Sequence, residues 1–98
     1  DMAKVRQALL GGFAASRVLE VHGQRMIDEN FTPGGKVTTQ HKDLRQAIEL
    51  GASEGLSLPA TELNMGLYQT LIDRGDGALD HSALFRLIRK STNPSEED

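Results

Sequence analysis

The chain has 98 residues, of which 38% are hydrophobic, and its 14 acidic and 11 basic side chains give a formal net charge of -3. This length fits one domain with a modest core, and the charge balance gives no reason to expect a nucleic-acid partner. The lack of Cys excludes disulfides and Cys-ligated zinc and fits a reducing, cytoplasmic setting. No apolar run approaches the ~20 residues that a membrane-spanning helix needs, so no membrane partner is expected.

Two helices are expected in the first third of the chain. Asp1 can cap the first helix, and Gly11-Gly12 can end it. Ser16 can cap the second helix, which Gly23 weakens and can split. The apolar residues at helical spacing are Met2, Val5 and Leu9 in the first helix and Val18, Leu19, Met26 and Ile27 in the second.

The middle of the chain predicts a glycine-containing break followed by two more helices. Residues 32–35 (Thr-Pro-Gly-Gly) form the break, and an amphipathic helix is expected from about Val37 to Gly55. Pro59 suits the first turn of the next helix. The expected apolar faces comprise Leu44, Ala47, Ile48 and Gly51 or Ala52 in the first of these helices and Leu63, Leu67, Leu71 and Ile72 in the second.

The last part of the chain predicts a turn, a capped helix and a polar end. Residues 74–77 (Arg-Gly-Asp-Gly) form the turn, and Asp80 is expected to cap a helix that buries Ala83, Leu84, Leu87 and Ile88. No segment alternates convincingly like a strand. The expected fold is therefore all-α, a bundle of four to five helices over residues 1–90, with a frayed acidic tail over 91–98.

Few side chains suggest chemistry by their spacing alone. His22, His41 and His81 fall in three different elements, without a pair at helical spacing, so no metal site is expected. The usual glycine-rich phosphate-binding motifs are missing. Lys42 falls in the first turns of the helix after the Pro-Gly-Gly loop. Its spacing alone favours a solvated surface lysine; the functional alternative is a cation that binds an anionic or hydroxyl-rich ligand at a domain edge.

An ordered set of short segments resembles the C-terminal domain of the β-hydroxyacid dehydrogenases, a family that includes 3-hydroxyisobutyrate dehydrogenase and 2-hydroxy-3-oxopropionate reductase. The resemblance covers nearly the whole chain up to about Leu87. Each segment is weak alone, whereas their order and spacing together are fairly specific. The segments are residues 5–16 (Val-Arg-Gln-Ala-Leu-Leu-Gly-Gly-Phe-Ala-Ala-Ser), 30–34 (Asn-Phe-Thr-Pro-Gly), 41–44 (His-Lys-Asp-Leu), 58–59 (Leu-Pro), 75–77 (Gly-Asp-Gly) and 80–84 (Asp-His-Ser-Ala-Leu).

The resemblance implies the helical half of a two-domain enzyme, with the C-terminal fold of the 6-phosphogluconate dehydrogenase type. An N-terminal Rossmann domain of the same chain would bind most of the NAD or NADP, and the catalytic lysine is expected upstream of Asp1. Lys42 matches the lysine that reaches the cofactor, and Asp43 matches a residue that helps to shape the substrate pocket. One departure is Gly35, because the family usually has phenylalanine after Pro-Gly.

The function that the resemblance implies is reversible hydride transfer between NAD(P) and a small β-hydroxy acid of the 3-hydroxyisobutyrate or 2-hydroxy-3-oxopropionate type. In this reading the helical domain closes the cleft and mediates homo-oligomerisation, and it is inactive by itself. The alternative is a stand-alone helical dimerisation or interaction module without catalytic activity. A third reading, a regulatory helical bundle unrelated to dehydrogenases, would require the ordered matches to be coincidental.

Overall fold

The computed structural model describes residues 1–92, except for the side chain of Ser91. Its described part contains five α-helices and a short 3-10 helix and no strand, which confirms the all-α prediction. The predicted tail falls mostly outside the described residues. No helix in the described part is long and apolar enough to cross a membrane. The chain divides into two compact units, Asp1–Phe31 and the part from Thr32 onward, and each is described by itself.

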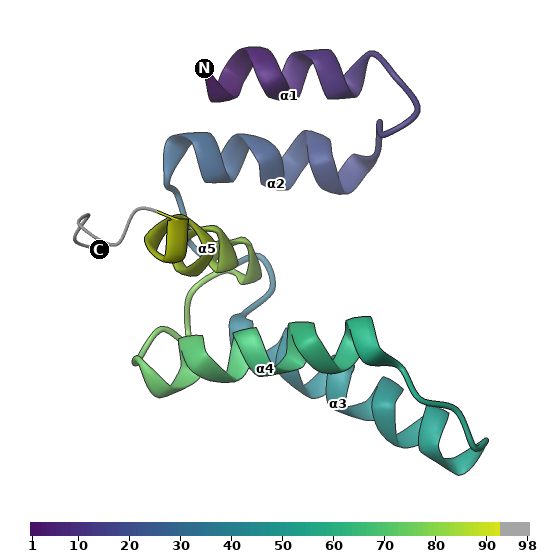
Figure 1. Ribbon diagram of the computed structural model, residues 1–98. Coiled ribbons are helices and arrows are strands. Elements are labelled where there is room, and N and C mark those ends of the chain that lie inside the picture. Colours follow the sequence, from purple (N-terminus) through teal and green to yellow (C-terminus); the bar gives the residue numbers. More distant parts are fainter. Residues whose placement is uncertain (93–98) are drawn as a thin grey trace. The chain divides into compact units, whose positions relative to one another are not determined.

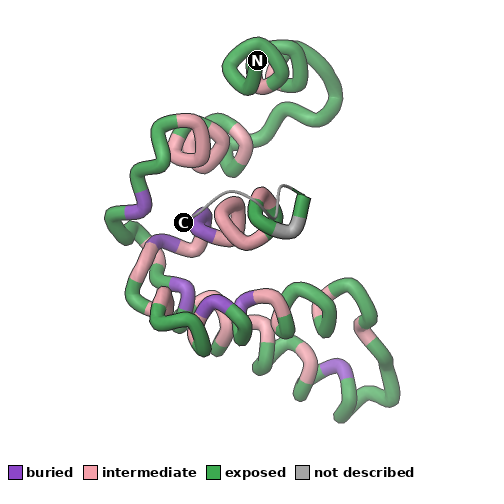
Figure 2. The backbone as a smooth tube through the Cα atoms, turned by 60° about the vertical axis from the view of Figure 1, so that its left-hand side comes forward, coloured by how far each residue is buried: buried purple, intermediate pink, exposed green. Residues whose placement is uncertain are grey.

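The first unit is a pair of helices, α1 (Met2–Leu10) and α2 (Arg17–Asp28), joined by a short turn (Figure 1). Both predicted caps are confirmed: the Asp1 carboxylate accepts from the Ala3 amide at 2.9 Å, and the Ser16 hydroxyl accepts from the Leu19 amide at 2.9 Å. These bonds satisfy amides that have no partner within a helix. No residue of either helix is buried, as the tube in Figure 2 shows.

Helix α2 runs unbroken through Gly23, so the split that this glycine suggested does not occur. The Arg6 side chain crosses at this point, and a Cβ at Gly23 would lie 3.3 Å from its Cδ. The Arg6 guanidinium then donates to the Glu20 carbonyl at 2.9 Å. Gly23 therefore gives the side chain of one helix room to lie against the other.

The second unit is built on two antiparallel helices, α3 (Val37–Ser53) and α4 (Pro59–Asp73). Pro59 occupies the first turn of α4, as predicted. A 3-10 helix, η1 (His81–Ala83), follows and leads into α5 (Leu84–Thr92), which packs against α4 and η1. Figure 1 shows α4 returning beside α3 and the chain then turning into α5.

The core of the second unit lies where α3, α4 and α5 meet. Val37 and Leu71 are fully buried and Tyr68 is 7% exposed. The partly buried hydrophobic residues packed against them are Leu44, Ile72, Leu84 and Leu87. The buried positions in Figure 2 follow the same helices. Val37 opens α3, so the core holds the beginning of that helix.

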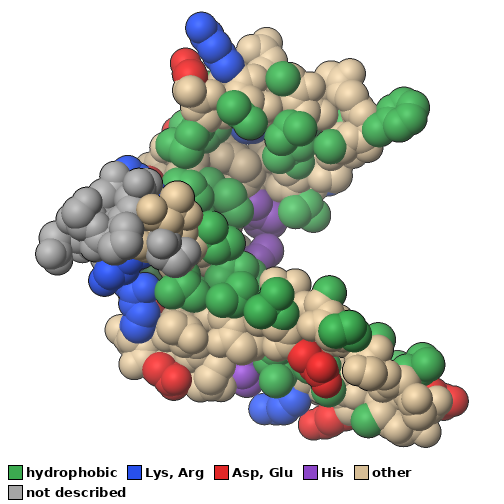
Figure 3. All heavy atoms as spheres, viewed as in Figure 1, with side chains coloured by type: hydrophobic (Ala, Val, Ile, Leu, Met, Phe, Trp, Pro, Cys, Tyr) green, Lys and Arg blue, Asp and Glu red, His purple; other side chains and the backbone are tan. Residues whose placement is uncertain are grey.

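Several residues of the predicted apolar faces are exposed, including Ala47 in α3. Leu63 is 66% exposed and Ile88 is 51% exposed, although each belongs to a helical apolar stripe. Leu63 lies in the early turns of α4, near the turn from α3, and Leu50 and Leu56 beside that turn are also exposed. Hydrophobic side chains consequently appear on the surface of both units in Figure 3. The apolar stripe of each helix therefore extends beyond the part that neighbouring helices cover.

Candidate cofactor-facing site

Lys42 and Asp43 lie in the second turn of α3, on the exposed surface of the second unit. The Lys42 ammonium is 3.9 Å from the Asp43 carboxylate, and the two side chains are 52% and 58% exposed. This distance is beyond hydrogen-bonding range, and an ion pair exposed to this degree contributes little to stability. Both charged groups can therefore meet a ligand without first breaking a strong internal contact.

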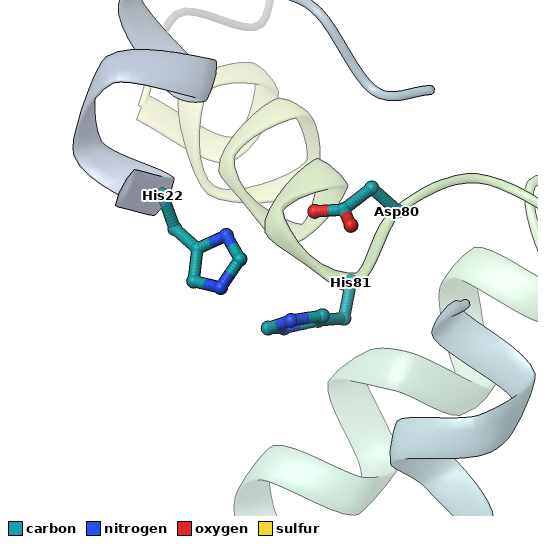
Figure 4. Close-up of side chains that lie close together, drawn as sticks. All are labelled: His22, Asp80 and His81. Atoms are coloured by element: carbon teal, nitrogen blue, oxygen red, sulfur yellow. The ribbon is translucent and has the colours of Figure 1, made fainter. Parts of the chain in front are cut away.

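The loop that leads into α3 is held by the carboxylate of Asp80. One of its oxygens, Oδ1, accepts from the amide of Gly34 at 2.9 Å and from the amide of Gly35 at 3.2 Å. The other oxygen, Oδ2, accepts from both the amide and the hydroxyl of Ser82. Figure 4 shows the Asp80 and His81 side chains projecting from the segment that opens η1. We call this set, Gly34, Gly35, Asp80 and Ser82, the Asp80 clamp.

The Asp80 carboxylate is fully buried, yet it is held in its ionised form. Burial raises its pKa, but the hydrogen bonds from the Ser82 hydroxyl and from the amides of Ser82, Gly34 and Gly35 outweigh burial. The net effect holds the pKa of Asp80 well below its usual range. The nearby Asp80 charge in turn adds to burial in raising the pKa of Tyr68, whose hydroxyl donates to the His81 carbonyl at 3.0 Å.

Backbone hydrogen bonds extend the clamp on both sides. The amide of His81 donates to the Gly35 carbonyl at 2.8 Å, and the amide of Val37 donates to the Leu79 carbonyl at 2.8 Å. The Thr38 amide donates to the Gly77 carbonyl at 3.1 Å. The first-turn amides of Val37 and Thr38 are thus already occupied, although a helix N-terminus often binds an anion through such groups. Positive charge near this end of α3 comes from side chains, those of Lys36 and Lys42.

Gly35 lies directly against the ring of His81. A Cβ at Gly35 would be 3.3 Å from His81 Cδ2, tighter than an ordinary contact. This is the position at which the dehydrogenase family usually has phenylalanine. In this chain, a larger side chain at position 35 would have to displace the His81 ring.

The predicted cap at Asp80 is confirmed, whereas the bonds from the Gly34 and Gly35 amides to the same carboxylate were not predicted. Asp80 does cap the next element, as predicted, since its carboxylate accepts from the Ser82 amide at 3.0 Å. Nothing in the residue pattern indicates that the same carboxylate also accepts from the amides of Gly34 and Gly35, which lie 46 and 45 residues earlier. A buried Asp can satisfy several amides at once, but sequence spacing does not say which distant ones.

The three histidines lie on three different elements, as predicted. His22 lies on α2 of the first unit, His41 on α3, and His81 at the start of η1. The absence of a metal site stays a prediction. The part of the chain from Thr32 to Thr92 contains no Cys, and the spacing of its residues suggests no Ser-His-Asp arrangement.

The second unit is thus an all-α structure that carries an exposed Lys-Asp pair on an anchored helix. A family model described as the NAD-binding domain of NADP-dependent 3-hydroxyisobutyrate dehydrogenase matches residues 1–88. The chain belongs to this family, which confirms the resemblance stated above. The family is enzymatic and its cofactor class is NAD(P).

Several curated relatives support the same assignment. The chain is 45% identical over 93 residues to a 2-hydroxy-3-oxopropionate reductase of Escherichia coli (strain K12), covering 95% of this chain and 32% of the relative. It is 32% identical over 95 residues, or 97% of its length, to a probable mitochondrial 3-hydroxyisobutyrate dehydrogenase-like protein of Arabidopsis thaliana, of which it covers 28%. A second such Arabidopsis protein is 29% identical over 90 residues, 92% of this chain and 29% of the relative. The chain thus spans about a third of the length of these relatives.

Proposed function

We propose that this chain is the helical, cleft-closing domain of an NAD(P)-dependent oxidoreductase that acts on a small β-hydroxy acid or on the matching semialdehyde. The observation that carries the proposal is the family match over residues 1–88, together with 45% identity to a relative named as a 2-hydroxy-3-oxopropionate reductase. The substrate would accordingly be of the 2-hydroxy-3-oxopropionate or 3-hydroxyisobutyrate type. The cytoplasm remains the expected compartment.

Lys42 is proposed to bind the dinucleotide. Its ammonium is exposed and lies 3.9 Å from the Asp43 carboxylate, while the Val37 and Thr38 amides at the start of the same helix already have partners. An anionic or hydroxyl-rich group approaching α3 here would meet this side chain. A charge-assisted hydrogen bond of this kind is roughly twice as strong as a neutral one.

Asp43 is proposed to face the substrate. It is the neighbour of Lys42 and equally exposed, and its carboxylate can accept a hydrogen bond from a substrate hydroxyl. The dinucleotide, when bound, supplies or accepts the hydride. The lysine that would stabilise charge on the substrate oxygen and the Rossmann domain are proposed to belong to another part of the full-length polypeptide. This chain would contribute binding and orientation, and alone it would be inactive.

The proposed partners are that Rossmann domain and further copies of the same protein. The exposed apolar residues of α1 support these partners. Helix α1 has no buried residue, and its Met2, Val5 and Leu9 are 47%, 58% and 44% exposed. Isolated helices are marginal in water unless an apolar face is packed. The exposed stripe also suits the alternative, a dimerisation module without catalytic activity, which the following experiment separates from the enzyme.

The test is the substitution Lys42→Ala in the full-length protein, with NADH and NADPH binding measured by fluorescence titration. We expect the dissociation constant of the preferred dinucleotide to rise about tenfold, as for the loss of one charge-assisted hydrogen bond. Lys36→Ala is the matched control, because Lys36 is an exposed lysine at the entry of the same helix and its side chain has no ion pair or hydrogen bond within the described residues.

Three results would decide against the proposal. If Lys42→Ala binds the dinucleotide as tightly as the natural protein does, Lys42 is not a cofactor ligand. If Lys36→Ala weakens binding equally, the effect is general charge attraction rather than a site. If the full-length protein neither binds a dinucleotide nor oxidises or reduces the small acids, the interaction-module alternative leads.

A further inference from the structure

The Asp80 clamp joins the entry of α3 to the entry of η1 by more contacts than a helix cap requires. A cap needs only the bond from the Ser82 amide, at 3.0 Å. The other oxygen of the same carboxylate accepts hydrogen bonds from the amides of Gly34 and Gly35. These two bonds fix the loop just before α3, which no role in capping η1 demands.

The clamp acts on the end of α3 that carries Lys42. Three further backbone bonds tie residues 35–38 to residues 77–81, and Val37 at the start of the helix is fully buried. Lys42 follows Val37 by five residues, which is about 7.5 Å along a helix at ~1.5 Å per residue. A helix transmits a change at its first turn to its second turn nearly as a rigid body. The direction in which Lys42 projects from the unit is therefore set where the clamp holds the chain.

The chemistry of the clamp gives this end of the helix a defined position. Buried polar groups without partners are costly, so the amides of Gly34, Gly35 and Ser82 all favour the one loop conformation that places them on the carboxylate. Neither Gly34 nor Gly35 has a side chain that could hold the loop in another way. An Asn at this position would keep one acceptor oxygen but would put an NH2 donor where the other oxygen stands, so it could not accept from the loop amides and from Ser82 in the same arrangement.

We infer that Asp80 is a positioning residue for the dinucleotide site, acting through Lys42. Asp80 does not touch the ligand in this assignment; it fixes the loop and first turn from which Lys42 reaches it. The inference rests on the proposed function, because it requires Lys42 to be a cofactor ligand.

A double-mutant cycle in the full-length protein tests it. The four proteins are the natural one, Asp80→Asn, Lys42→Ala and the double variant, and the measured quantity is the dissociation constant of the dinucleotide. We expect Asp80→Asn alone to raise the constant about fivefold, and to raise it by less than twofold when Lys42 is already Ala, since interacting residues are not additive. Asp76→Asn is the control: Asp76 lies in the neighbouring turn, and its side chain makes no hydrogen bond or ion pair within residues 1–92.

The outcomes separate the inference from the function beneath it. If Lys42→Ala leaves binding unchanged, the proposed function fails at this residue. If Lys42→Ala weakens binding but Asp80→Asn weakens it equally in both backgrounds, Asp80 is only structural and the inference is overturned. Should Asp80→Asn fail to fold, Ser82→Ala takes its place, because it removes the hydroxyl donor that helps to orient the carboxylate on which the loop amides depend. A small loss with Ser82→Ala that vanishes in the Lys42→Ala background supports the inference, and an additive loss or none overturns it.

Discussion

The amide of Gly35 donates a hydrogen bond of 3.2 Å to the carboxylate of Asp80, 45 residues further along the chain. This bond closes the second unit, because the loop before its first helix is fastened to the turn before its last. The amide of Gly34 adds a second bond to the same oxygen at 2.9 Å. Two segments of the unit that lie 45 residues apart in sequence are therefore joined by one ionised side chain.

The first prediction concerns pH. The pKa of Asp80 is lowered in the folded protein, so its carboxylate stabilises the fold fully above its unfolded pKa of about 4. As pH falls below that value, Asp80 becomes protonated in the unfolded state while it stays ionised in the folded state. The contribution of Asp80 to the free energy of unfolding is therefore progressively lost. We expect Asp80→Asn to lower the free energy of unfolding by about 2–4 kcal/mol at pH 6, since the NH2 group replaces one acceptor oxygen, leaves buried donors on that side without an acceptor and removes the charge.

The measurement is urea unfolding of the full-length protein and the Asp80→Asn variant at pH 6 and pH 3. The gap between the two proteins should shrink at pH 3, where the natural carboxylate has lost part of its advantage. Asp76→Asn should cost little at pH 6, because its side chain has no hydrogen bond within the described residues. An equal gap at both pH values would show that the charge of Asp80 is not what the clamp uses.

The second prediction concerns the contact between Gly35 and His81. A methyl group at position 35 would lie 3.3 Å from His81 Cδ2, so the ring must shift by a few tenths of an ångström. We expect Gly35→Ala to lower the free energy of unfolding by up to about 1 kcal/mol, as mild overpacking does. In a His81→Ala background the same substitution should cost nothing. A cost that persists there would place the strain in the backbone of the loop instead.

The third prediction compares two leucines of α4. Leu71 is fully buried and Leu63 is 66% exposed. Leu71→Ala should lower the free energy of unfolding by about 2–5 kcal/mol, through lost burial and the cavity left behind. Leu63→Ala should change it by less than about 0.5 kcal/mol. Thermal and urea unfolding of the two variants would check the difference, and similar losses would mean that Leu63 is covered in the full-length protein.

These two leucines also show how far the sequence predicts the fold. Periodicity placed both on one apolar face of one helix, and the helix exists as predicted. Caps at Asp1, Ser16 and Asp80 were predictable as well, because each bond is local. Which turn of the face is covered depends on the helices that pack across it, and helical spacing contains no information about them.

For the candidate site too, the sequence predicts some residues, and only the tertiary structure shows the long-range contacts. Lys42 and Asp43 came from the resemblance, and the structure adds that both are exposed at the start of an anchored helix. The bonds from Gly34 and Gly35 to Asp80 could not be predicted, because a buried carboxylate is satisfied by whichever amides the tertiary fold brings to it. The family match supports the proposed function, and the long-range contacts show how the start of α3 is held.

The last prediction uses two glycines with open surroundings. No heavy atom would lie within 4 Å of a Cβ at Gly66 or at Gly75, so neither substitution meets a steric barrier. Gly66 lies inside α4, where Ala is favoured by ~1 kcal/mol. Gly75 has a φ of 90°, a left-handed conformation that costs other residues about 1 kcal/mol. Gly66→Ala should therefore raise the melting temperature of the full-length protein and Gly75→Ala should lower it. Shifts of the same sign would contradict the backbone assignment of one of the two positions.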